Sequence, residues 1–244
     1  MTYAIRLYND QLSADQLDAE ELSEAHRLIY VRSGSVRIND AEYCKDDVFA
    51  CSSTLQVSAA DEQSEIWRWE LVPINDQPRL LSQMGCCSHL LMTSPLTTLN
   101  LFEGDTWLFR LDRMMFPAGY VVPCHHNAGP GIRCVQQGSF SFHEGTHGKQ
   151  EMLPGTPFFE SGAEPCMAWG SIQMSSGFVR SMVLDRSHEG KMVTSFPDRS
   201  KLKPGPEWTL LCDLEVLLKA LPQQYRGQRV NWCPSKTLSE AVHS

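Results

Sequence analysis

Two stretches of this chain repeat one pattern of strand, glycine turn and strand. Residues 27–38 read Arg-Leu-Ile-Tyr-Val-Arg-Ser-Gly-Ser-Val-Arg-Ile, and residues 131–142 read Gly-Ile-Arg-Cys-Val-Gln-Gln-Gly-Ser-Phe-Ser-Phe, so that Gly34 matches Gly138. Each copy is followed by a strand of alternating apolar and polar residues, at 66–71 and at 179–184. A repeat at this spacing predicts two copies of one small domain. The chain has 244 residues, which is enough for both.

Most of the chain reads as short strands separated by Gly, Pro and Asn-Asp turns. The clearest strands lie at residues 28–31, 35–38, 66–71, 106–111, 132–135, 139–142 and 177–184. Many short strands at close spacing predict an all-β sandwich or barrel. A capping box at Ser13–Gln16 predicts a short helix that runs toward Glu24. The leucines between residues 210 and 221 fit either a helix or a strand, and Pro222 ends any helix there.

Composition excludes several classes of function. The net charge is −8, whereas binding to DNA, RNA or an anionic membrane surface requires a basic face. No run of 18 apolar residues is present, and the first residues do not form a secretory signal. The nine cysteines contain no Cys-x-x-Cys pair, which favours reduced core residues. We therefore expect a cytoplasmic protein without nucleic-acid or membrane partners.

Two segments of the second copy carry a family resemblance. Gly119-Tyr-Val-Val-Pro-Cys-His-His-Asn127, followed by Gly-Pro-Gly-Ile-Arg at 129–133 and the Gly138 turn, resembles the first motif of cupins. Leu153-Pro-Gly-Thr-Pro-Phe-Phe-Glu-Ser-Gly162 resembles the start of the second cupin motif. The whole pattern is similar to bacterial two-domain cupins (bicupins), most of them without an assigned function.

The resemblance implies an all-β fold of two tandem cupin-type jelly-roll β-barrels, with a short N-terminal helical piece and a C-terminal extension. The expected domains are a degenerate N-terminal barrel with its linker at 1–95, a C-terminal barrel with a partial metal motif at 96–203, and the extension at 204–244. Cupins tend to pair, so the resemblance also implies a homodimer.

Cupin enzymes hold Fe, Mn, Ni or Zn with three His and one Glu, and the resemblance allows each position to be tested. His125 occupies the first His position, but Asn127 occupies the second, and an amide is a weaker ligand than imidazole. The Glu position falls at Gly131, and the third His position falls near Pro165 or Cys166. At most one of the four ligands keeps its place.

These positions allow two interpretations of the site, one with a metal ion and one without. Because His126 and Glu160 lie close to the motif positions, a rebuilt metal site of His125, His126 and Glu160 is chemically reasonable. The alternative, which we prefer, is a pocket without metal. The first copy holds Arg27, Glu21 and Ser23 at the motif positions, so it is expected to be structural or dimerising.

The leading functional hypothesis is a second barrel that binds a small, acidic organic molecule. Arg133 could hold a carboxylate if it points into the barrel, and it is an ordinary surface residue if it points outward. The expected ligand-binding residues are His125, Asn127, Arg133, Glu160, Phe158 and Trp169. One alternative is a metal-dependent dioxygenase, isomerase or lyase, and another is a non-catalytic oligomeric or regulatory module.

Overall fold

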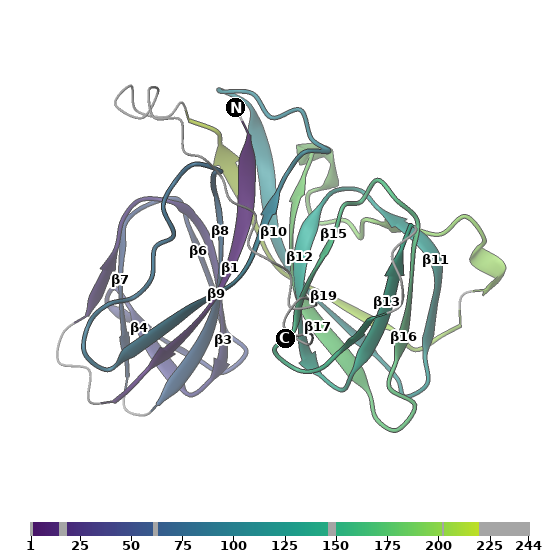
Figure 1. Cartoon of the computed structure of the whole chain (residues 1–244), viewed down its shortest axis with the longest axis horizontal. Helices are drawn as coiled ribbons and strands as arrows, with labels where there is room; N and C mark the ends of the chain where they lie inside the picture. The colour runs from purple at the N-terminus through teal and green to yellow at the C-terminus, as the bar shows by residue number, and fades with distance from the viewer. Residues whose placement is uncertain (1, 15–18, 61–62, 146–149, 202, 220–244) are drawn as a thin grey trace, which may run out of the picture.

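The chain folds into two β-barrels. The computed structural model describes residues 2–14, 19–60, 63–145, 150–201 and 203–219. Within these residues the regular structure consists of nineteen strands and two short 3-10 helices, η1 (Arg186–His188) and η2 (Arg199–Lys201). Figure 1 shows the two barrels side by side, with β1, β10 and β12 near the line between them.

The first barrel consists of two antiparallel sheets. One sheet has the order β6-β3-β8-β1-β9 and the other β2-β7-β4-β5. The strands are β1 (Tyr3–Leu12), β2 (Glu20–Leu22), β3 (His26–Ser33), β4 (Ser35–Ile38), β5 (Ala41–Cys44), β6 (Val48–Cys51), β7 (Leu55–Ala59), β8 (Ser64–Pro73) and β9 (Cys86–Pro95).

The second barrel repeats this plan. Its sheets have the orders β15-β12-β17-β10-β19 and β14-β13-β16-β11-β18. The strands are β10 (Thr106–Phe116), β11 (Val121–Asn127), β12 (Gly131–Gln137), β13 (Phe140–Glu144), β14 (Gln150–Met152), β15 (Pro157–Glu160), β16 (Cys166–Gly170), β17 (Ser176–Leu184), β18 (Thr194–Ser195) and β19 (Glu207–Leu217). The all-β fold predicted from the sequence is confirmed.

The glycine turn that revealed the repeat has one conformation in both barrels. Gly34 and Gly138 have φ of 70° and 69°, a region that favours glycine. A Cβ on Gly34 would lie 2.6 Å from the Gln63 carbonyl oxygen, and one on Gly138 would lie 2.5 Å from that of Ser175. Both positions therefore require glycine, because φ is positive and because a Cβ would collide with a backbone carbonyl oxygen.

The irregularities of the sheets repeat as well. Where β9 joins β1, the register shifts between Leu7 and Tyr8, and where β19 joins β10 it shifts between Leu111 and Asp112. The arginine just before each shift donates to backbone carbonyls of a neighbouring loop, which follows β8 in the first barrel and β17 in the second. Arg6 donates to the carbonyl of Ile74, and Arg110 donates to those of the loop after β17. The two barrels are thus copies in structure as well as in sequence.

One hydrophobic core joins the barrels. The β6-β3-β8-β1-β9 sheet of the first barrel faces the β15-β12-β17-β10-β19 sheet of the second, with β3 against β10 and β1 against β12. Alternate residues of these strands point into the shared layer. The buried members are Tyr3, Ile5, Leu7, Leu28, Tyr30, Trp67, Trp69, Leu71, Leu96, Leu101, Phe109, Leu111, Ile132, Cys134, Val179, Val183, Val216 and Leu218.

The predicted N-terminal helix is wrong. Leu12 ends β1, and Glu20–Leu22 forms β2, which pairs with β7. Residues 15–18, which include part of the capping box, lie outside the described residues. Tertiary pairing therefore prevails over the local helix signal.

The leucine-rich segment near the end is a strand. β19 lies along β10 as the counterpart of β9 along β1, although it belongs to the predicted extension. Pro222 and Cys233 lie outside the described residues, in which the other eight cysteines are free. No helix in the described part of the chain is long and apolar enough to cross a membrane.

Candidate functional site

A break in strand β11 aims the motif residues into the second barrel. The register with β16 shifts between Val122 and His125, and Cys124 in this break is exposed. Val122, His125 and Asn127 are all buried, which a regular alternation could not achieve. Bulges of this kind re-aim side chains next to functional sites.

His125, Glu160 and Cys166 form a buried cluster. One ligand atom from each lies within 4.8 Å of the others. His125 Nε2 lies 3.1 Å from Cys166 Sγ, and Nδ1 lies 2.9 Å from the Pro123 carbonyl oxygen. Because only a protonated Nδ1 can donate to that carbonyl, Nε2 accepts from the thiol.

Burial sets the charge state of this pair. Burial lowers the pKa of His125 below its usual value of 6.5, which keeps the imidazole neutral at pH 7. Burial, with Glu160 close by, raises the pKa of the Cys166 thiol. The two side chains therefore form a neutral hydrogen-bonded pair.

Arg133 points into the barrel and pairs with Glu160. The side chain is fully buried, and its Nη2 lies 2.5 Å from Glu160 Oε2. Its Nη1 donates to the Gly131 carbonyl oxygen at 2.7 Å. Of the two orientations that the sequence allowed, the structure shows the inward one. The carboxylate partner of Arg133 is a residue of the protein itself.

Asn127 links this pair to a second buried ion pair. Its Nδ2 donates to Glu160 Oε2 at 2.5 Å, and its Oδ1 accepts from Arg180 Nη1 at 3.0 Å. Arg180 also binds Asp112 through two hydrogen bonds of 2.7 and 3.0 Å. Trp208 Nε1 donates to the same Asp112 carboxylate at 2.9 Å. The polar network therefore runs without a break from β19 to Glu160.

The charges of this network cancel. Arg133 and Arg180 contribute two positive charges, and Glu160 and Asp112 contribute two negative ones. Because buried charges are tolerated only when paired, this balance explains how four ionised groups fit inside one barrel.

A cavity of about 290 Å³ lies beside the network, inside the second barrel. Its walls are mostly aromatic, and its polar groups include His125, Glu160 and Arg180. The apolar lining comprises Met114, Phe116, Tyr120, Val122, Phe140, Phe142, Phe158, Ala168, Phe178, Met192, Phe196, Pro204 and Pro206. A cavity with apolar walls and a few polar groups is the usual form of a small-molecule site.

The segment after β17 forms part of the wall of this cavity. Thr194 and Phe196 line the cavity, and so does the run from Lys203 to Pro206. Tyr120 Oη donates to the Lys203 carbonyl oxygen at 2.9 Å, which ties the segment to the barrel wall. We call residues 192–201 and 203–206 the strap.

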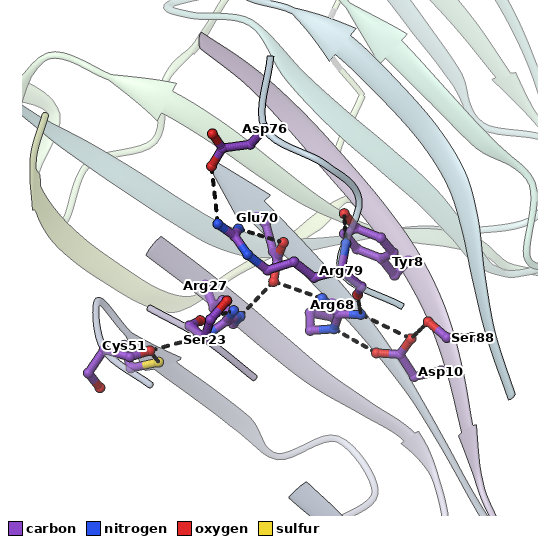
Figure 2. A network of polar contacts seen from close by, with 11 residues as sticks. Tyr8, Asp10, Ser23, Arg27, Cys51, Arg68, Glu70, Asp76, Arg79 and Ser88 are labelled. Carbon is purple, nitrogen blue, oxygen red and sulfur yellow. Dashed lines mark hydrogen bonds and ion pairs between the residues drawn. The ribbon is translucent and has the colours of Figure 1, made fainter. Parts of the chain in front are cut away.

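The first barrel has ion pairs in its interior instead. Figure 2 shows Arg68 between two carboxylates, 2.7 Å from Asp10 and 2.7 Å from Glu70. Arg27 Nε also donates to Glu70 at 2.6 Å, and Arg79 lies 3.5 Å from its other oxygen. Arg27, predicted at the Glu position of the motif, is thus fully buried in a salt bridge. The structural or dimerising role expected for the first copy stays a prediction.

The structure brings together most of the predicted site residues. His125, Phe158 and Glu160 line the cavity, and Asn127 and Arg133 hold Glu160 from behind. Of the described residues, neither His126 nor Trp169 is among those that line the cavity. His126 pairs with Ser195 of β18, outside the cluster.

Sequence reasoning missed Arg180 and Asp112. Arg180 lies on β17 and Asp112 lies on β10, and both strands are outside the motif segments. In β10 the alternation of charged and apolar residues around Asp112 is a signal that could have identified it, whereas Arg180 is the single charged residue of β17.

Several solved structures are similar to this chain. AerE from Microcystis aeruginosa matches with a TM-score of 0.51 at 14% identity, over 74% of this chain and 88% of that chain. A mutant of Bacillus subtilis oxalate decarboxylase OxdC matches with a TM-score of 0.51 at 10% identity, over 80% and 68%. Procruciferin, an 11S globulin from Brassica napus, matches with a TM-score of 0.50 at 6% identity, over 74% and 76%. These neighbours are cupin-superfamily proteins. The chain has the cupin fold. No protein-family model and no curated protein matches the sequence.

The residues present do not fit the cupin metal centre of three His and one Glu. Asn127 is engaged by Glu160 and Arg180, and a Cβ on Gly131 would lie 2.0 Å from the Ser181 carbonyl oxygen. No side chain of any kind can therefore stand at the Glu position. Backbone packing, as well as residue type, therefore excludes the cupin ligand set from this barrel.

A different donor set does lie in this cupin barrel. The imidazole, carboxylate and thiol of His125, Glu160 and Cys166 are the ligand types that zinc accepts, and three protein ligands are usual for a catalytic zinc. His125 also donates its other ring nitrogen to a carbonyl, as metal-bound histidines do. These three residues could hold a divalent ion.

Proposed function

We propose that the second barrel binds a small organic molecule inside the cavity. The observation that supports this proposal is the pairing of about 290 Å³ of aromatic-walled space with a polar group of His125 and Glu160 at one place in its wall. The strap contributes Phe196 and Pro204 to the apolar wall that such a molecule would contact.

Filling the cavity tests this proposal. Ala168 lines the cavity, and Ala163 is exposed in the loop between β15 and β16. We expect Ala168→Leu to weaken the binding of small aromatic compounds at least tenfold, and Ala163→Leu to leave it unchanged. Binding can be followed by NMR of ¹³C-methyl methionine, because Met114 and Met192 line the cavity. Equal binding by both variants would contradict the proposal.

A second candidate is a metal-dependent enzyme, which the cluster of His125, Glu160 and Cys166 favours. A bound divalent ion would act there as a Lewis acid on a substrate oxygen. The three side chains would hold it, and Asn127 and Arg133 would orient the Glu160 carboxylate.

Metal content separates the two candidates. In a metalloenzyme the purified protein carries about one equivalent of metal, and both His125→Ala and Cys166→Ser lose it. Cobalt(II) gives a second readout, because a thiolate ligand adds a charge-transfer band that Cys166→Ser removes. Wild-type protein that takes up no cobalt would rule the second candidate out.

A further inference from the structure

The cations of the second barrel are already committed. All three nitrogens of Arg180 donate hydrogen bonds, two to Asp112 and one to Asn127. Arg133 gives Nη1 and Nη2 to Gly131 and Glu160, and although its buried Nε has no partner, this side chain is not among the residues that line the cavity. An acidic ligand would therefore find no uncommitted positive charge at the polar group of the cavity.

The imidazole is committed too. His125 accepts the Cys166 thiol at Nε2, and its Nδ1 donates to Pro123. Because both ring nitrogens have partners, His125 contributes mainly a flat face to the cavity. Its ring lies 5.6 Å from that of Phe196 on the strap.

Glu160 uses only one of its two oxygens. Oε2 accepts from Asn127 and Arg133, both at 2.5 Å, and Cys166 Sγ lies 3.8 Å from it. No hydrogen bond reaches Oε1 from any residue that the structure describes. Since Glu160 lines the largely apolar cavity, Oε1 is the oxygen left to accept a hydrogen bond from a bound molecule. A carboxylate oxygen in such a place requires a donor.

We propose that the ligand of the second barrel is an aromatic or similarly apolar molecule with one hydrogen-bond donor, a hydroxyl or an amine, that binds Glu160 Oε1. This inference rests on the proposed function and replaces the acidic ligand expected from the sequence. An acid would place its carboxylate beside that of Glu160, and two such like charges repel strongly in a buried site.

Lys203 is the one cation at the cavity that no ion pair engages among the described residues, and it is exposed on the strap. An acid held there would leave its ring near the opening and its carboxylate in solvent. Exposed charge pairs contribute little to binding. Lys203 therefore does not make an acid a better ligand than a molecule with a hydrogen-bond donor.

Four probes of one size test the proposal: toluene, benzyl alcohol, benzylamine and benzoate. Each is titrated into protein freed of metal with a chelator, and binding is followed through the methyl signals of Met114 and Met192. We expect benzyl alcohol and benzylamine to bind at least tenfold more tightly than toluene and benzoate. Benzoate or toluene binding as tightly as the alcohol would overturn the donor inference and leave the proposed function intact. Failure of all four probes would overturn both.

Glu160→Gln gives an independent readout. The glutamine oxygen can still accept from Asn127 and Arg133, which turns its NH₂ group toward the cavity. We expect the preference to shift from benzylamine toward benzoate by at least tenfold. Glu164→Gln, the same change at an exposed position nearby, should leave the order unchanged. An unchanged order in folded Glu160→Gln would contradict the proposal, and the wild-type ranking decides the matter if that variant does not fold.

Discussion

Asn127 holds the site together because it is an amide. It donates to the Glu160 carboxylate on one side and accepts from the Arg180 guanidinium on the other. Thr194 Oγ1 also donates to its Oδ1 at 2.9 Å, which ties the network to the strap. A carboxylate in this place would repel Glu160. A neutral imidazole could replace the amide only if one ring nitrogen donated to Glu160 and the other accepted from Arg180.

The Arg133–Glu160 pair provides a prediction at this scale. Arg133→Met keeps most of the side-chain volume but leaves Glu160 buried without its counter-charge. Removing one partner of a buried pair typically costs about 3–5 kcal/mol. We expect that loss in the free energy of unfolding, measured in urea.

The double-mutant cycle tests whether the two residues act as a pair. With Glu160→Gln already present, we expect Arg133→Met to cost at least ~1 kcal/mol less than in the wild type. Strictly additive effects would show that Arg133 stabilises the barrel by another route.

His26 provides a prediction about pH. Burial lowers its pKa below 6.5, and its Nδ1 lies 2.8 Å from Ser52 Oγ. The unfolded chain therefore binds a proton near pH 6.5 while the folded chain does not, so stability falls as the pH drops below that value. We expect His26→Asn to flatten this fall by up to ~1.4 kcal/mol per pH unit.

The matched control is His89→Asn, because His89 is exposed on β9. Urea melts at several values between pH 7 and pH 5 give the slopes. Equal slopes for His26→Asn and the wild type would show that His26 takes no part in the pH dependence.

Single residues could be predicted only where a motif fixed their neighbours. His125, Phe158 and Glu160 could be found because all three lie in the two segments that resemble cupin motifs. The direction of Arg133 could not be derived, because one strand allows two faces until its partner sheet is known. Asp112 and Arg180 depend on the pairing of β10 with β17, which is set by tertiary structure.

The paired glycine turns provide a prediction at the scale of elements. Alanine at Gly138 requires a positive φ and a Cβ 2.5 Å from the Ser175 carbonyl oxygen. We expect Gly138→Ala and Gly34→Ala each to cost more than ~1 kcal/mol in the free energy of unfolding. Gly190→Ala is the control, because its φ is 68° but no atom lies within 4 Å of the added Cβ.

Loss of stability no larger than that of Gly190→Ala would mean that the φ angle alone matters. In that case the close approach of the backbone would not be the reason for glycine at either turn.

Strands and helices differ in how far the sequence predicts them. The strands with strict alternation, such as β4 and β8, were predicted because their period matches one buried face. The segment that ends in β2 was predicted as a helix because a capping box is a local signal, whereas its pairing with β7 is not. β19 stayed undecided because its register shift against β10 breaks the alternation.

The shared core provides a prediction for the whole molecule. Trp67 of β8 is fully buried in that core, with its ring 6.2 Å from Trp69 and 6.0 Å from Tyr30. Trp67→Ala should cost about 3–5 kcal/mol. Because both barrels contribute to the core, we expect amide hydrogen exchange to accelerate in β12 as well as in β3. Unchanged protection in β12 would show that the barrels unfold independently.

The homodimer and the cytoplasmic location remain predictions. The sheet faces that join the two barrels are already covered within one chain. A second copy would therefore have to use other surfaces, and sedimentation at several concentrations would reveal it. A single species of 27.5 kDa would contradict the expected homodimer.

The position of the cavity relative to the shared core affects how such a chain can change over generations. The cavity described above lies in the second barrel, whereas both barrels contribute to the core that joins them. Substitutions on the cavity walls therefore alter a binding site while the first barrel's part of the core stays intact. Selection can then act on binding in one half while the other half preserves the folded state.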